Sequence, residues 1–504
     1  MRQLLQSLRS RTVIRTAAII CVGFWLTSTA YLAWAYTVMK LVSPRAADAV
    51  SLVAAYLFQA AGIGLFELFL RTNPSRIRQA TYAALLAHLL CLIPAVLAVS
   101  LRNVLLFGLP MNLLCGWISG YYLYRLTAGT AAGIRAVTLG SGYGVSILFL
   151  WLLSLSGNDH AGNSVRALWI CLLLTLAMIL LTARAVPVSP DMMKAEHSGP
   201  DMVKTEHSGP DMVKAEHSGQ DMMKAEYSGH DMMKAELSDP AGSGLFLSKE
   251  LPLRSILLSA GSLVLIFSIV NSCGFGFPSA DLNAGVSLEF SRLFYAAGLI
   301  IAGIVHDTNR RYGAVCALSA LVIPFIMLAL KGESVSLMIF WALSYFAFGF
   351  YSVFRMILFS DISGQKNLLW LSGFGLLIGR IGDAVGEAVH LLCLNRLPLL
   401  VLITAILFIA AVVLFLRVYR ILYLPENRRE PSERERFNAF SAQHDLSARE
   451  REVLRLLLQE KSSSEIAQTL SVSESTVKFH IHNLLQKTGC KNRVALLSEY
   501  ATRT

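Results

Sequence analysis

The chain has 504 residues, of which 55% are hydrophobic and only 15% are charged, and its mean hydropathy is +0.55. Soluble domains carry about 25% charged residues, so this composition excludes an ordinary soluble enzyme and indicates an integral membrane protein. The formal net charge is +11. The eight cysteines stand singly and form no CxxC pair, so neither a zinc site nor a disulfide framework is indicated.

Long apolar stretches predict twelve transmembrane helices, because a spanning helix needs about 20 mostly apolar residues. The first six are predicted near 16–37, 49–70, 79–101, 103–124, 134–156 and 166–183. The other six are predicted near 254–274, 288–306, 312–330, 335–358, 369–393 and 398–420. We therefore expect an all-α fold with a first six-helix half over 1–183, a cytoplasmic linker over 184–253 and a second six-helix half over 254–423.

The distribution of Lys and Arg predicts the orientation, since cytoplasmic loops carry the excess of positive charge. With a cytoplasmic N-terminus, nine Lys and Arg residues of the first half fall inside and four fall outside. The corresponding numbers for the second half are six and two. We therefore expect a multi-pass protein of the cytoplasmic membrane with both termini in the cytoplasm.

A charged loop with the sequence GIVHDTNRRYG at 303–313 follows the eighth predicted span. This loop and the six-plus-six arrangement resemble the major facilitator superfamily, whose two helical bundles enclose a cavity near the membrane midplane. In that superfamily a glycine–aspartate–arginine loop joins neighbouring helices by charge pairing, which the resemblance implies for Asp307 and Arg310. The resemblance covers about 1–420 and concerns the fold more than transport.

The eleventh predicted span carries four ionisable residues at offsets of three, four and three, which place them on one helical stripe: Arg380, Asp383, Glu387 and His390. Such groups are costly inside a membrane and usually face a cavity or one another. Two interpretations stay open, an internal ion-pair network or a binding site for a small polar ligand or a proton. Asp307 and Arg310 belong to the same candidate membrane site. Further ionisable candidates are Glu67, His88, Glu289, Arg292 and Arg355.

Residues 190–239 contain a ten-residue unit, beginning PDMMKAEHSG, that is copied five times. Each unit buries almost nothing, so a flexible or transiently helical acidic tether is predicted. A metal-binding array is the alternative, through His197, His207 and His217. Later copies place Tyr227 and Leu237 at that position, which a ladder of metal ligands tolerates poorly. We therefore predict no metal site.

The composition changes abruptly after the last apolar stretch. A charged segment over 424–439 is predicted to be a linker, and a small soluble domain of four short helices is predicted over 440–504. Three capping signals open its first three helices: Ser447 with Glu450, Ser462 with Glu465, and Ser473. The second and third helices are joined by a tight turn at 471–473, which is typical of a helix-turn-helix whose second helix enters the major groove. From residue 476 onward the sequence contains five basic residues and one acidic residue, an excess of positive charge that is typical of a surface facing DNA phosphates.

This segment resembles the LuxR-type helix-turn-helix family through LSAREREVL at 446–454, EIA at 465–467, LSVSESTVKFH at 470–480 and KTGCKNR at 487–493. The resemblance implies that the recognition helix contacts bases through Lys478, Phe479 and His482. It implies phosphate contacts from Thr476, Lys487 and Arg493. It also implies a structural role for Glu450 and dimerisation through the fourth helix.

Together these features predict a membrane-bound, one-component transcription regulator that senses a ligand or membrane signal through its multi-span domain. The expected partners are double-stranded promoter DNA, the lipid bilayer, an unidentified small molecule and a second copy of the chain in a DNA-bound homodimer. A solute transporter of major-facilitator type with an attached regulatory domain is the alternative, and a membrane anchor for DNA is a third reading. The sequence contains no GxSxG, HExxH or Walker-type loop, so no enzyme activity, catalytic residue or cofactor is predicted.

Overall fold

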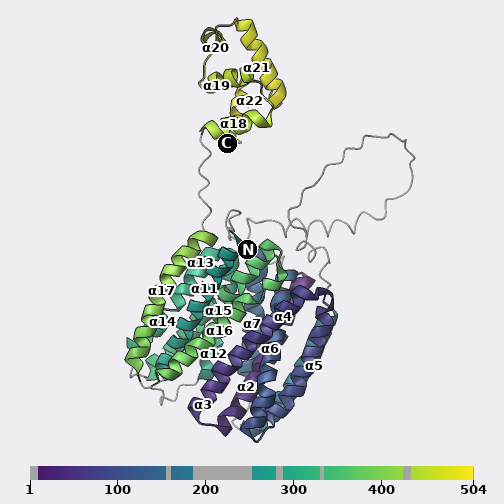
Figure 1. The fold of residues 1–504 in the computed structure, drawn as a ribbon, viewed down its shortest axis with the longest axis vertical. Coiled ribbons are helices and arrows are strands. Elements are labelled where there is room, and N and C mark those ends of the chain that lie inside the picture. The colour runs from purple at the N-terminus through teal and green to yellow at the C-terminus, as the bar shows by residue number, and fades with distance from the viewer. Residues whose placement is uncertain are drawn as a thin grey trace, which may run out of the picture. The chain divides into compact units, whose positions relative to one another are not determined.

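The computed structural model describes residues 10–154, 160–185, 252–279, 288–329, 334–394, 396–423 and 433–502. Helices make up the regular structure of these residues, and no strand occurs among them. The chain divides into two compact units, Met1–Leu424 and Pro425–Thr504 (Figure 1). The repeats at 190–239, including the three histidines of the alternative metal array, lie outside the described residues.

The first half of the larger unit follows the six predicted spans. Its elements are α2 (Arg11–Leu41), α3 (Pro44–Asp48), the π-helix η1 (Ala49–Ala54), α4 (Ala55–Thr72), the 3-10 turn η2 (Pro74–Arg76), α5 (Ile77–Val96), α6 (Leu101–Gly129), α7 (Ala132–Ser154) and α8 (His160–Ala183). The second predicted span is thus a continuous run of α3, η1 and α4, in which one π-helical turn interrupts the α-helix.

The second half contains α11 (Leu253–Ser279), α12 (Leu288–Thr308), α13 (Arg310–Ala320), α14 (Ile323–Ala329), α15 (Ser334–Lys366), η4 (Leu369–Leu371), α16 (Phe374–Leu392) and α17 (Leu397–Tyr423). The single helix predicted over 312–330 is wrong, because α13 and α14 are separate. Pro324 explains the break: it lies in the first turn of α14, where it has no amide to continue the preceding helix.

Nine of the described helical segments are long and apolar enough to cross a membrane. The unit is therefore a multi-pass membrane domain. Its two halves meet most closely where α7 packs against α12. Glycines allow this approach, since a Cβ atom on Gly140 would lie 2.2 Å from the carbonyl oxygen of Leu299, and one on Gly303 would lie 2.6 Å from that of Ala136. Small residues bring membrane helices into backbone contact in this way.

The described residues of the smaller unit form five helices, α18 (Glu433–Gln443), α19 (Ala448–Leu458), α20 (Ser463–Leu470), α21 (Glu474–Thr488) and α22 (Arg493–Thr502). The capping boxes of α19 and α20 and the serine cap of α21 are present as predicted. Helix α18 was not predicted. It occupies part of the segment 424–439 that is predicted to be a linker, and it buries Phe437 and Phe440 in the core of the domain.

Candidate functional site

The recognition helix α21 is held against α19 and α20 by its apolar side. Val477 and Leu484 are fully buried in the core of the smaller unit. The turn before α21 passes through Ser471, whose φ of 53° lies in the left-handed region, and Ser473 then caps the helix by accepting a hydrogen bond from the Thr476 amide. Gly489 ends α21 with a φ of 71°, in the left-handed region that favours glycine.

The three predicted base-contacting residues lie on the exposed side of this helix. Lys478, Phe479 and His482 lie on the side opposite Val477 and Leu484. Phe479 is 60% exposed although it is a large apolar side chain. The ammonium of Lys478 lies 3.0 Å from the carboxylate of Glu474, one turn earlier, in an exposed pair that is easily exchanged for another acceptor. All three side chains are therefore accessible from outside the domain, as insertion of the helix into the major groove of DNA requires.

The three predicted phosphate-contacting residues have partners inside the domain. The ammonium of Lys487 lies 2.7 Å from Glu450 Oε2 and donates to the carbonyl of Asp445. Arg493 donates to the carbonyl of Lys461 at 2.7 Å. The hydroxyl of Thr476 shares a 2.7 Å hydrogen bond with that of Ser473. Sequence reasoning missed these contacts, since each partner except Ser473 is more than 30 positions away.

Glu450 has the structural role that the family resemblance implies. Its side chain is only 5% exposed, and Oε2 accepts hydrogen bonds from the Ser447 amide and from Lys487, both at 2.7 Å. Burial by itself raises the pKa of Glu450, but the hydrogen bonds from Lys487 and Ser447 outweigh it and hold this pKa below its ordinary value. The carboxylate therefore closes the capping box of α19 and ties it to the end of the recognition helix.

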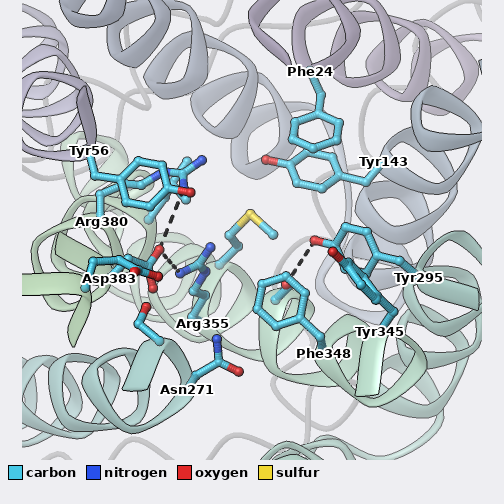
Figure 2. Close-up of a pocket in the computed structure, with 15 residues that line it drawn as sticks. Phe24, Tyr56, Tyr143, Asn271, Tyr295, Tyr345, Phe348, Arg355, Arg380 and Asp383 are labelled. Carbon is cyan, nitrogen blue, oxygen red and sulfur yellow. Dashed lines mark hydrogen bonds and ion pairs between the residues drawn. The ribbon is translucent and has the colours of Figure 1, made fainter. Parts of the chain in front are cut away.

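The membrane unit contains a cavity of about 290 Å³ between its two halves (Figure 2). Helices α2, α4 and α7 of the first half contribute only aromatic side chains to it, namely Phe24, Tyr56 and Tyr143. Helices α11, α12, α15 and α16 of the second half contribute every charged group of the lining and several more aromatic rings. The cavity therefore has a charged wall, formed by the second half, and an aromatic wall to which both halves contribute.

One carboxylate organises the charged wall. Asp383 Oδ2 lies 2.9 Å from a guanidinium nitrogen of Arg355 and 3.7 Å from one of Arg380. Arg355 also donates to the hydroxyl of Tyr351 at 3.2 Å. Arg380 lies over the ring of Tyr56, with 4.5 Å between the guanidinium carbon and the ring centre, which is a cation–π distance.

The predicted stripe on α16 is thus compatible with both interpretations, an internal ion-pair network and a ligand-binding site. Arg380, Asp383 and Glu387 line the cavity, and the ion pairs of Asp383 form a network within it. His390 is not part of the lining and lies 3.6 Å from Glu387. Arg355, which sequence reasoning offered only as a further candidate, completes the network from α15. Glycines of α16 permit the packing, because a Cβ atom on Gly375 would lie 1.9 Å from the carbonyl oxygen of Arg355.

Asp307 and Arg310 do not belong to that cavity, so the single candidate membrane site is divided in two. Arg310 lies 2.6 Å from both Asp307 and Asp361, and Arg135 of the first half lies 2.8 Å from Asp361. The carboxylate of Asp307 accepts hydrogen bonds from the amides of Ala136 and Val137 in α7. The charge pairing implied for this loop is present, and it joins the two halves.

Two further ionisable candidates are buried elsewhere in the membrane unit. Glu67 of α4 accepts a 2.6 Å hydrogen bond from the amide of Gly373 at the start of α16, so it also bridges the halves. His88 lies 3.4 Å from the thiol of Cys115 inside the first half. The side chain of the candidate Glu289 lies outside the described residues. No cluster of three or more metal-ligating side chains occurs in the part of the chain that the structure describes.

The smaller unit has the architecture of a DNA-binding helix-turn-helix domain. Residues 444–499 match the family model described as bacterial regulatory proteins, luxR family. The spore germination protein GerE of Bacillus subtilis is 50% identical over 54 residues, which are 11% of this chain and 73% of GerE. The nitrate/nitrite response regulator protein NarP of Escherichia coli is 48% identical over 60 residues, or 11% of this chain and 28% of NarP. The chain belongs, through this domain, to the LuxR family of bacterial regulatory proteins.

The larger unit has its own structural neighbour. The crystal structure of the human organic anion transporter MFSD10 (TETRAN) superposes with a TM-score of 0.52 and 12% sequence identity, covering 82% of this chain and 99% of that chain. The likeness shows a common fold. The fusion of a major-facilitator-like membrane domain with a LuxR-type helix-turn-helix domain is thereby confirmed.

Proposed function

We propose that this protein is a membrane-bound, one-component transcription regulator. In this proposal the bundle of the cytoplasmic membrane detects a small molecule in its cavity, both termini are cytoplasmic, and the C-terminal domain binds promoter DNA as a homodimer. One observation carries it: a LuxR-type domain with an exposed recognition helix shares a chain with a multi-pass unit that has a polar cavity.

The recognition helix supports the DNA-binding part of the proposal. Lys478 is placed to donate to guanine or to phosphate, and the exposed ring of Phe479 is placed to contact a thymine methyl group. Thr476 and Arg493 are proposed as further phosphate contacts, as the family resemblance implies. Lys487 contributes mainly by holding Glu450. Two such domains in a dimer would read half-sites about one helical turn apart, or a multiple of it.

The contacts between the halves support the sensing part. The two halves are joined by polar contacts such as the pair of Arg135 with Asp361 and the hydrogen bond from Gly373 to Glu67. A ligand that binds one arrangement of the halves more tightly than another shifts the population between them. Such a shift changes how two C-terminal domains are presented for pairing on DNA.

A second candidate function is solute transport combined with regulation. The observation in its favour is that the cavity lies between the two halves of a major-facilitator-like fold, as substrate sites of secondary transporters do. Asp383→Asn separates the two functions. Loss of solute uptake in this variant favours transport, whereas altered promoter output with no measurable uptake in either protein favours sensing.

The experiment that tests the regulator is selection of fragmented genomic DNA at moderate salt by the full-length protein in lipid nanodiscs and by residues 425–504 alone. The Lys478→Ala variant is the comparison, and Glu452→Ala, an exposed residue of α19 outside the recognition helix and the fourth helix, is the matched control. We expect a few promoters to be enriched by the wild type and the control and lost in Lys478→Ala. Equal recovery of all sequences at low salt by both preparations contradicts the proposal.

A further inference from the structure

The two walls of the cavity define the chemistry of its ligand. We propose that the cavity binds a small aromatic zwitterion, a molecule with one aromatic ring, one carboxylate and one ammonium group, as in an aromatic amino acid. This inference rests on the proposed sensing function and names the class of signal. It follows from the rings, the charged groups and the volume of the site.

Aromatic rings from both halves line one side of the cavity. Phe24 and Tyr143 stack with their ring centres 3.9 Å apart and their planes 9° apart. Tyr295 and Phe348 stack on the opposite half at 5.1 Å. Figure 2 shows these four rings grouped on the side away from Arg380 and Asp383. Rings prefer offset-stacked and edge-to-face partners, so this wall favours a planar ring over an aliphatic chain.

The paired guanidinium groups provide the anion-binding end. Arg355 and Arg380 share a single carboxylate, Asp383, so the three groups together carry one excess positive charge. The side chain of Arg355 is only 6% exposed, and Arg355 is part of the cavity lining beside Asp383. A carboxylate is the matching group, because guanidinium and carboxylate pair through two parallel hydrogen bonds.

Glu387 provides the opposite charge. It follows Asp383 by four residues on α16, which places it one turn further along the same side of the helix. Its side chain lines the cavity and is 15% exposed. The charged lining thus balances, with two arginines against Asp383 and Glu387. Glu387 lies 3.6 Å from His390 on its own helix, and Arg355 and Arg380 lie beside Asp383. A ligand with a single charge would pair with one end of this lining only, whereas a zwitterion pairs with both.

The volume limits the size of the ligand. A cavity of about 290 Å³ lies at the lower end of the range for small-molecule sites. It corresponds to roughly ten water molecules at liquid density, about 30 Å³ each. One ring with a short charged chain fills such a space.

Isothermal titration of the full-length protein in lipid nanodiscs tests the ligand class. The probes are L-phenylalanine, L-tyrosine and L-tryptophan, each compared with its deaminated acid and its decarboxylated amine, and L-valine serves as the aliphatic zwitterion. We expect at least one aromatic amino acid to bind ten or more times tighter than its acid, its amine and L-valine. The proposal is overturned if no aromatic amino acid shows this preference.

Two substitutions then assign the ends of the ligand. Arg380→Gln should weaken binding of the amino acid at least tenfold while leaving the weaker affinity for the amine unchanged, as measured by competition. Glu387→Gln should weaken binding of the amino acid and leave that of the acid unchanged. Val385→Ala, on the outer side of α16 at 42% exposure, is the matched control and should behave as the wild type. Equal losses for amino acid, acid and amine in both variants contradict the assignment.

Promoter output separates a wrong ligand class from a wrong function. If no probe binds but Arg380→Gln alters promoter output, the sensing function stands and the aromatic zwitterion is wrong. If an aromatic amino acid binds with the expected preferences and output never responds to it, the ligand class stands and the sensing function is wrong.

Discussion

Glu450 connects helix α19 with the end of the recognition helix α21, so its removal tests how these two helices are held together. In Glu450→Ala the reciprocal hydrogen bond of the capping box is lost, at about 1 kcal/mol. The hydrogen-bonded pair with Lys487 is lost as well, at about 1 kcal/mol more after allowance for the 38% exposure of the lysine. We therefore expect residues 425–504 to lose about 2 kcal/mol of unfolding free energy.

The assay is thermal and urea unfolding of this fragment followed by circular dichroism. A loss of 2 kcal/mol lowers Tm by about 8–16 °C in a domain of this size. Glu465→Ala is the matched control, because Glu465 closes the same kind of capping box in α20 but is exposed. We expect the control to be destabilised less than Glu450→Ala. If the two substitutions lower the unfolding free energy equally, neither the contact with Lys487 nor the burial of Glu450 contributes to the stability of the domain.

The same carboxylate makes a pH-dependent contribution to stability. Because the pKa of Glu450 is lower in the folded domain than in the unfolded chain, its contribution is complete above the unfolded value, about 4.3. It is lost as the pH falls through the lower, folded value. The difference in unfolding free energy between the wild type and Glu450→Gln should therefore be constant near neutral pH and shrink below about pH 4. A difference that persists unchanged in acid contradicts this account.

Four further substitutions test other contacts. Lys478→Ala should weaken specific DNA binding by about 1–3 kcal/mol in fluorescence anisotropy, with the unfolding free energy changed by less than about 0.5 kcal/mol. Phe437→Ala should destabilise the smaller unit by about 3–5 kcal/mol in urea unfolding, since Phe437 is buried in its core. Gly140→Ala should lower the Tm of the full-length protein in detergent, because the added methyl group meets the backbone of α12, whereas Gly64→Ala meets only a flexible leucine end at 3.4 Å and should be tolerated. Glu67→Ala removes the carboxylate that contacts the start of α16, so it should change promoter output in the absence of ligand. Unchanged promoter output at equal protein levels would contradict this prediction.

The DNA-binding domain was largely predictable because its signals are local. The capping boxes and the left-handed turn before α21 depend on residues three or four positions apart. Helix α18 escaped prediction for the opposite reason. Phe437 and Phe440 lie among charged residues and give no apolar period of their own, and the core that buries them comes from α19 and α22.

Nine of the twelve predicted spans coincide with a described helix that is long and apolar enough to cross a membrane, but hydropathy did not predict the partners of the charged residues. The contact between Arg380 and Asp383 follows from a spacing of three on one helix. The stronger contact to Asp383 comes from Arg355, 28 positions earlier on α15. The pair of Arg135 and Asp361 joins residues 226 positions apart, and neither was singled out in the sequence. Spacing indicates which residues share a helix face, whereas these pairs depend on which helices become neighbours.

Helix α16 relates the cavity to the contacts between the halves. Its first turn begins at Gly373, whose amide is held by Glu67 of the first half, and a carboxylate is favoured at a helix N-terminus. Arg380 and Glu387 follow on the same helix about 10 Å and 20 Å further along its axis, at 1.5 Å per residue. A ligand that binds these side chains therefore acts on the same rigid element that Glu67 holds. Differential binding of about 5.5 kcal/mol would convert a 1:99 population of two arrangements into 99:1, and a smaller difference gives a graded response.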